Sequence, residues 1–140
     1  MKIELAKTEI IHFVGIGGIG MSGLALIMKN MGFKIQGSDA SSSKNIERLK
    51  KNKIKVVLGH QKKNIKAATV LVISSAIKKS NPEILAAKKK QLPIYKRGEM
   101  LAHITSLTKN IVITGSHGKT TTTSLVAAVF SNAKLDPTII

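Results

Sequence analysis

Apolar residues along the first hundred positions occur in short continuous runs that alternate with segments of helical spacing. Residues 10–14 (IIHFV) form such a run, which is typical of a buried strand, and residues 21–31 carry apolar side chains at helical spacing before Gly32. The same alternation predicts further strands at 33–37, 54–59, 69–75 and 93–95, and further helices at 44–52, 82–90 and 98–107.

Near-continuously apolar strands alternating with helices predict an α/β fold with a parallel sheet covered on both faces. The strand–turn–helix pattern begins again at Lys109, with KNIVITGSHGKTTTTSLVAAVF, and residues 136–140 are expected to enter another strand. We therefore predict a domain boundary near 107–109. Residues 1–107 then form one whole domain, and residues 108–140 form the truncated start of a second α/β domain.

Charge and composition narrow the classes of partner. The formal net charge of +16 suggests nucleic acid, but the basic residues are scattered lysines except for Arg48 and Arg97, and no aromatic side chains interleave with them. A basic nucleic-acid-binding module therefore remains only an alternative. The absence of Cys, of a signal peptide and of an apolar run of about 20 residues predicts a cytoplasmic protein without a membrane partner. The oligomeric state is left open.

The first candidate site is a glycine-rich turn between the first strand and the first helix. Such a G-x-G-x-x-G turn brings bare backbone close to a diphosphate, and an acid at the end of the next strand, here Asp39, can bind ribose hydroxyls. The pattern indicates a Rossmann-like domain; a tight turn without ligand and an NAD-dependent oxidoreductase are the alternatives. The residues of this turn are Gly15, Ile16, Gly17, Gly18, Ile19 and Gly20.

A second glycine turn also follows a predicted strand and opens a predicted helix. Its G-K-T ending is typical of a P-loop, in which Lys119 reaches the β- and γ-phosphates of ATP and the hydroxyl of Thr120 binds Mg²⁺. The turn is shorter than the usual P-loop, because Ile113 stands where the first glycine is expected, and His117 is expected to shape it. The predicted ATP-binding residues are Gly115, Ser116, His117, Gly118, Lys119, Thr120 and Thr121.

The stretches HFVGIGGIGMSGLA and GSHGKTTTT, with VISSAI, RGEMLA and AKLDPT, resemble the Mur ligases of peptidoglycan synthesis over essentially all 140 residues. The resemblance implies that the first domain holds the UDP of a UDP-sugar rather than NAD. It also implies that the second binds ATP and Mg²⁺ through a loop in which Ser116 replaces the family's usual Thr. The GIGGIGM turn is most similar to the members that add L-alanine to UDP-N-acetylmuramate.

The activity that the resemblance implies is ATP-dependent carboxylate–amine ligation. The lactyl carboxylate is phosphorylated, the alanine amine attacks the acyl phosphate, and phosphate leaves. Lys119 is the expected catalytic residue, because it stabilises charge on the transferring phosphoryl group. The first glycine turn is expected to hold the UDP diphosphate, with Asp39 near the ribose or uracil. The chain alone is expected to be inactive, because later domains are missing.

Several residues near strand ends have weaker assignments. Ser74 and Ser75 are expected to line the UDP-sugar site, and capping of the next turn is their alternative. His60 is either a loop residue or a ligand contact, and Arg97 either pairs with a phosphate or begins a solvated helix. His12, within the first strand, is expected in the core or at an edge.

Overall fold

The computed structural model describes residues 3–139 and divides the chain into two compact units, Met1–Leu107 and Thr108–Ile140. Within the described range no helix combines the length and apolar character needed to cross a membrane. In chain order the elements are β1 (Ile10–Val14), α1 (Ile19–Asn30), β2 (Lys34–Asp39), α2 (Lys44–Lys51), β3 (Lys55–Leu58), the 3-10 helix η1 (Lys62–Ile65), β4 (Val70–Ile73), α3 (Pro82–Lys89), β5 (Ile94–Lys96), α4 (Arg97–Ser106) and α5 (Lys119–Asn132).

The first unit is built on a parallel sheet with the strand order β3-β2-β1-β4-β5. The chain moves outward from β1 to β3 on one side, then returns to β4 beside β1 and continues to β5. The direction of winding therefore reverses between β1 and β4, and in open α/β sheets ligands bind outside the carboxyl ends of the strands at that point. The first glycine turn follows β1 at this same edge.

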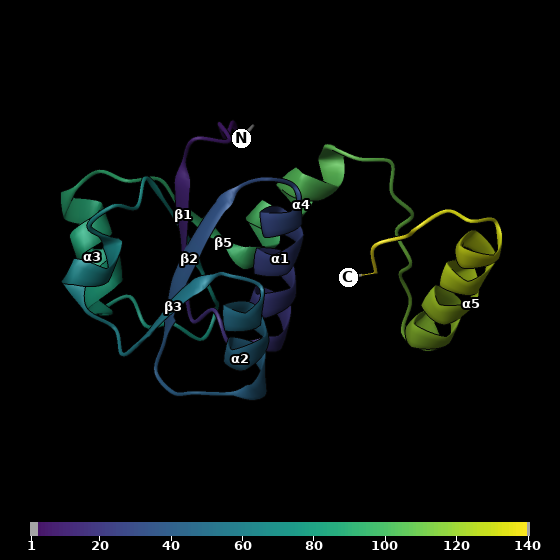
Figure 1. Ribbon diagram of the computed structural model, residues 1–140, viewed down its shortest axis with the longest axis horizontal. Helices are drawn as coiled ribbons and strands as arrows, with labels where there is room; N and C mark the ends of the chain where they lie inside the picture. Colours follow the sequence, from purple (N-terminus) through teal and green to yellow (C-terminus); the bar gives the residue numbers. More distant parts are fainter. Residues whose placement is uncertain (1–2, 140) are drawn as a thin grey trace. The chain divides into compact units, whose positions relative to one another are not determined.

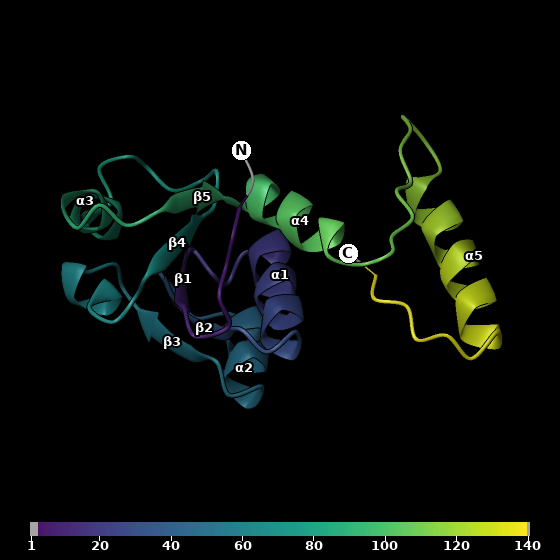
Figure 2. The same ribbon diagram turned by 90° about the horizontal axis from the view of Figure 1, so that it is seen from above.

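Helices cover both faces of the sheet, as Figures 1 and 2 show: α1, α2 and α4 lie on one side and α3 lies on the other. Alternate residues of β1 serve the two layers. Ile11 and Phe13 are fully buried in the larger core with α1, whereas Val14 packs in a smaller core with Ile65 and Ala87. His12 shares the face of Val14 and is also buried, which places it in the core as expected.

The α/β fold predicted from the alternating pattern is confirmed, with small shifts at element ends. The first helix begins at Ile19, two residues earlier than expected, and ends at Asn30, before Gly32 with its φ of +90°. The third helix begins at Pro82, where the Asn81 side chain accepts a hydrogen bond of 2.9 Å from the N–H of Glu83.

The strand predicted to begin at Lys109, before the second glycine turn, does not form. Residues 109–115 carry no regular structure, and Ile111 and Val112 are 60% and 75% exposed. The predicted strand at 136–140 is likewise absent through Ile139, and Ile140 lies outside the described residues. A strand requires a partner for its backbone groups, and the described part of this unit supplies none. In the described part of the second unit, α5 is therefore the regular element, and it follows the second glycine turn.

Candidate functional site

The first glycine turn is held in place by the end of β2. Gly15 has a φ of +79°, and the N–H groups of Gly15 and Ile16 donate to the Ser38 carbonyl at 2.9 and 3.0 Å. The Ile16 side chain is fully buried in the larger core. Ile16 therefore anchors the turn through packing, and neither its amide nor its side chain is presented to a ligand.

Asp39 closes the other side of the turn. Its Oδ2 accepts a hydrogen bond of 2.8 Å from the N–H of Gly17, and a Cβ at Gly17 would lie 2.9 Å from that oxygen. The Asn45 side chain donates to the Gly17 carbonyl at 2.8 Å. Only glycine leaves room for this approach, so the carboxylate sets the shape of the turn; its contact with ribose or uracil stays a prediction.

The amides free to meet an anion begin after Gly18. The Gly18 N–H donates to the Gly15 carbonyl at 3.3 Å, and the first helical bond runs from the Ser22 N–H to the Gly18 carbonyl at 2.8 Å. Among the described residues, the N–H groups of Ile19, Gly20 and Met21 have no backbone partner. The first turn of α1 therefore presents the amides that are available to an anion, whereas the glycines before it mainly shape the turn.

The two serines after β4 differ in their surroundings. The Ser74 Oγ accepts a hydrogen bond from the N–H of Ala76 at 3.3 Å and so caps the turn after β4. A Cβ at Gly15 would lie 3.5 Å from the Ser74 Cβ. Ser75 is exposed. Ser74 thus borders the glycine turn from the β4 side, while a ligand contact by either serine stays a prediction.

Arg97, the first residue of α4, lies against the start of α1. A Cβ built on Gly20 would lie 3.1 Å from its Nη1, 3.2 Å from its Cδ and 3.3 Å from its Cζ. The guanidinium therefore packs over the first turn of α1, where the free amides are. Gly20 leaves the space that this side chain fills.

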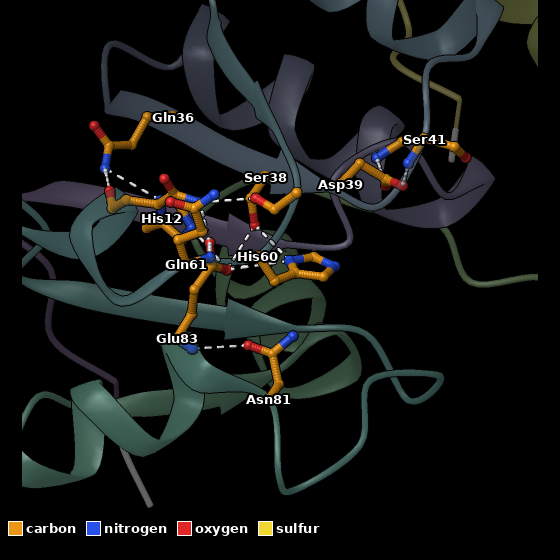
Figure 3. Close-up of polar contacts among 12 residues, drawn as sticks. His12, Gln36, Ser38, Asp39, Ser41, His60, Gln61, Asn81 and Glu83 are labelled. Atoms are coloured by element: carbon orange, nitrogen blue, oxygen red, sulfur yellow. Dashed lines mark hydrogen bonds and ion pairs between the residues drawn. The ribbon is translucent and has the colours of Figure 1, made fainter.

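A buried polar cluster, drawn in Figure 3, stands beside the glycine turn on the face of the sheet opposite α1. At its centre is Glu83, which is 0% exposed and accepts hydrogen bonds of 2.6 Å from both the Ser38 hydroxyl and the Asn64 side chain. Its other partners, each at 3.4 Å, are His12 Nε2, His60 Nδ1 and the N–H of Gln61.

The partners of Glu83 keep it ionised. Burial alone raises the pKa of the Glu83 carboxyl, but hydrogen bonds from His12, Ser38 and Asn64 outweigh that effect and lower it to about 2. A buried carboxylate is costly unless it is paired and hydrogen-bonded. Here one carboxylate ties β1, β2 and η1 to α3.

The cluster also fixes the proton positions on the two histidines. Gln36 Nε2 donates to the Asn64 carbonyl at 3.2 Å and lies 3.1 Å from His12 Nδ1, so Nδ1 accepts and Nε2 carries the proton that faces Glu83. His60 Nδ1 lies 3.0 Å from the Ser38 oxygen, whose own proton is donated to Glu83, so this nitrogen carries a proton. His60 is 17% exposed and leaves Nε2 outside these bonds.

From the sequence, Glu83 has no assigned role beyond its place at the start of the helix predicted at 82–90. One signal pointed further: Glu83 is the only acidic residue between Glu47 and Glu99. A lone acid among many lysines that opens an apolar helix is a candidate for a buried role, but only the packing of α3 against the sheet reveals its partners.

The second glycine turn carries its predicted residues at the start of α5. Gly115 and Gly118 have φ values of +150° and +75°, and the first helical bond runs from the Thr122 N–H to the Gly118 carbonyl at 2.9 Å. Lys119 Nζ donates to the Gly115 carbonyl at 2.5 Å, so the ammonium folds over the turn. This arrangement has the free amides and the cation that a phosphate requires.

Magnesium has few ligands here. No group of three or more His, Cys, Asp or Glu side chains suited to a metal occurs in the part of the chain that the structure describes. Mg²⁺ commonly uses one or two carboxylates, nucleotide phosphates and water. The Thr120 hydroxyl fits one position of such a set, so the bound nucleotide would supply much of the remainder.

These features agree with comparisons to known proteins. Residues 10–109 match the model of the Mur ligase family, catalytic domain, and the chain belongs to this family. It is 78% identical over 140 residues to the UDP-N-acetylmuramate–L-alanine ligase of Pelagibacter ubique, and 56% identical over 140 residues to the protein of that name from Bartonella bacilliformis. All of this chain is covered in both, but it spans only 30% and 29% of those relatives.

Solved structures agree. The UDP-N-acetylmuramate–alanine ligase of Thermotoga maritima superposes with a TM-score of 0.82 at 33% identity, covering 90% of this chain and 30% of the other. The UDP-N-acetylmuramate:L-alanyl-γ-D-glutamyl-meso-diaminopimelate ligase of Neisseria meningitides gives 0.80 at 32% identity, covering 89% and 40%. The family resemblance inferred from the two loops is thereby confirmed.

Proposed function

We propose that this chain is the N-terminal part of an ATP-dependent ligase that joins L-alanine to UDP-N-acetylmuramate. The observation that carries the proposal is the presence of two different glycine turns in one chain of this family, each opening a helix with unpaired amides. The names of relatives up to 78% identical support the choice of substrates.

The first unit is assigned to the UDP-sugar. The turn from Gly15 to Gly20 lies at the carboxyl edge where the sheet reverses its winding, with Asp39 and Ser74 on either side. An NAD-dependent oxidoreductase would use a similar turn, but it has no need of the Lys119 loop. The UDP-sugar is therefore the better ligand for this edge.

The second unit is assigned to ATP. Lys119 and the amides that open α5 would hold the phosphates, and Thr120 would bind Mg²⁺, which neutralises charge on the transferring phosphoryl group. Phosphorylation of the lactyl carboxylate then lets the alanine amine displace phosphate. ATP and a UDP-sugar as substrates place the reaction in the cytoplasm.

Two experiments test the proposal. Calorimetry of the 140-residue chain should detect UDP-N-acetylmuramate and no NADH; binding of NADH alone would contradict the assignment of the first unit. In a chimaera, residues 1–140 replace the matching segment of the Pelagibacter ubique relative. It should form UDP-N-acetylmuramoyl-L-alanine with release of phosphate, whereas a folded but inactive chimaera would contradict the ligase assignment.

A further inference from the structure

A hollow of about 250 Å³ lies beside the buried polar cluster, on the face of the sheet opposite α1. The register of β1, β2 and β3 puts His12, Gln36 and Lys55 next to one another on this face, and Lys63 and Asn64 of η1 complete the lining. The hollow is several times the roughly 30 Å³ of one water, but smaller than the about 300–1,000 Å³ of pockets for drug-sized ligands. It therefore suits one small group.

Two lysines from different elements line the hollow. Lys55 belongs to β3 and Lys63 to η1, and both residues are exposed. Within residues 3–139, neither ammonium group has an ion pair or a hydrogen bond. Like charges that line one small hollow repel each other, and an anion bound between them removes that repulsion.

The acid nearest to the hollow already has its partners. Glu83 is 0% exposed and is the only acidic residue between Glu47 and Glu99. Its oxygens accept hydrogen bonds of 2.6 Å from the Ser38 hydroxyl and from the side chain of Asn64, which also lines the hollow. Two ammonium groups therefore outnumber one hydrogen-bonded carboxylate, and the balance of charge favours an anion.

Gln36 adds an acceptor to this lining. Its Nε2 donates to the Asn64 carbonyl at 3.2 Å and lies 3.1 Å from His12 Nδ1, and Figure 3 shows the amide oxygen directed away from these partners. Within the described part of the chain this oxygen has no hydrogen-bond partner. The occupant should therefore carry a proton to donate as well as negative charge. Hydrogen phosphate has both, whereas sulfate has no such proton near pH 7.

We propose that this hollow binds the phosphate group of a small molecule, either free phosphate or a phosphate monoester. Lys55 and Lys63 bind its charged oxygens, and the Gln36 oxygen accepts its proton. The lining residues are distinct from those of both glycine turns, so the proposal does not depend on the ligase function proposed above.

The test follows the side-chain amide signals of Gln36 and Asn64 by NMR in the isotope-labelled 140-residue chain, at pH 7 and constant ionic strength. Inorganic phosphate should shift both signals along a saturable curve, and sulfate should bind at least about threefold more weakly. Lys63→Gln should weaken phosphate binding at least about fivefold. Lys66→Gln removes the same charge just after η1 and is the matched control, which should bind phosphate as the unchanged chain does.

Glycerol 2-phosphate, titrated in the same way, distinguishes the two sources. Shifts with inorganic phosphate alone identify free phosphate as the ligand, and shifts with the ester identify a phosphorylated small molecule. The proposal is overturned if neither probe shifts the two signals beyond sodium chloride, or if Lys63→Gln and Lys66→Gln bind phosphate equally. Sulfate that binds as tightly as phosphate would overturn the role of Gln36. Both substituted lysines are exposed, and thermal melting should confirm that the variants fold.

Discussion

The carboxylate of Glu83 accepts a hydrogen bond of 2.6 Å from the hydroxyl of Ser38, 45 residues earlier in the chain, and both residues are 0% exposed. Ser38 also offers its backbone carbonyl to the N–H groups of Gly15 and Ile16. Ser38, near the end of β2, therefore connects the buried carboxylate on one face of the sheet to the first glycine turn at the edge of the sheet.

Glu83 should make the stability of the first unit depend on pH. Its folded pKa of about 2 lies below the ordinary value of 4.5, so its contribution is fully present above pH 4.5 and is lost as the pH falls toward 2. The shift corresponds to about 3 kcal/mol. The free energy of unfolding, measured by urea titration at several pH values, should therefore fall on acidification by more in the unchanged chain than in Glu83→Gln.

Glu83→Gln itself should lower the free energy of unfolding at pH 7, because an amide cannot accept from all the donors that now face the carboxylate. Leu85→Gln is a suitable control, because Leu85 lies on the same helix and is 52% exposed. Equal pH profiles for the unchanged chain and Glu83→Gln would show that Glu83 is not ionised in the folded state as described.

Gly37 and Gly23 should respond in opposite directions to substitution by alanine. A Cβ at Gly37 would lie 2.6 Å from the Ile16 Cδ1 and 2.7 Å from the Phe13 carbonyl oxygen, so Gly37→Ala should destabilise by about 1–3 kcal/mol. Gly23, inside α1, has no such neighbour within 4 Å, so Gly23→Ala should stabilise by up to about 1 kcal/mol. Urea unfolding measures both, and a neutral Gly37→Ala would contradict the close packing at β2.

Asp39 should tolerate asparagine better than alanine. Asparagine keeps an oxygen that accepts from the Gly17 N–H, now bonded at 2.8 Å, whereas alanine leaves this amide without its partner. Asp39→Ala should cost about 1 kcal/mol of unfolding free energy, and Asp39→Asn clearly less. If the two variants unfold alike, the carboxylate does not hold the turn in the way the distances indicate.

Lys119 should be required for ligation but not for binding of the UDP-sugar. In the chimaera with the Pelagibacter ubique relative, Lys119→Ala should reduce phosphate release to background, because the γ-phosphoryl group loses its cation. Calorimetry should find UDP-N-acetylmuramate binding unaltered. Lys109→Ala removes a charge ahead of the same turn and should retain activity; turnover that survives Lys119→Ala would contradict the catalytic role.

Much of the architecture was available from local sequence patterns. The apolar run before Gly15 and the helical spacing after Gly20 both reflect burial of adjacent elements, and burial is what periodicity reports. The Asn81-Pro82 start of α3 was also predictable, because capping involves only residues within one turn of the helix. The strand expected from Lys109 was mispredicted because its apolar residues indicate only a preference for burial, whereas a strand forms when a neighbouring strand pairs with it.

By itself the sequence determined the α/β class, the two glycine turns and the family, because all three can be recognised from short stretches of neighbouring residues. The tertiary structure alone decided which amides of the first turn remain free, that Arg97 lies over Gly20, and that Glu83 joins two histidines to Ser38. Each of these depends on elements far apart in sequence meeting at one edge or face of the sheet. Such meetings are set by the packing of helices on strands, which local spacing does not encode.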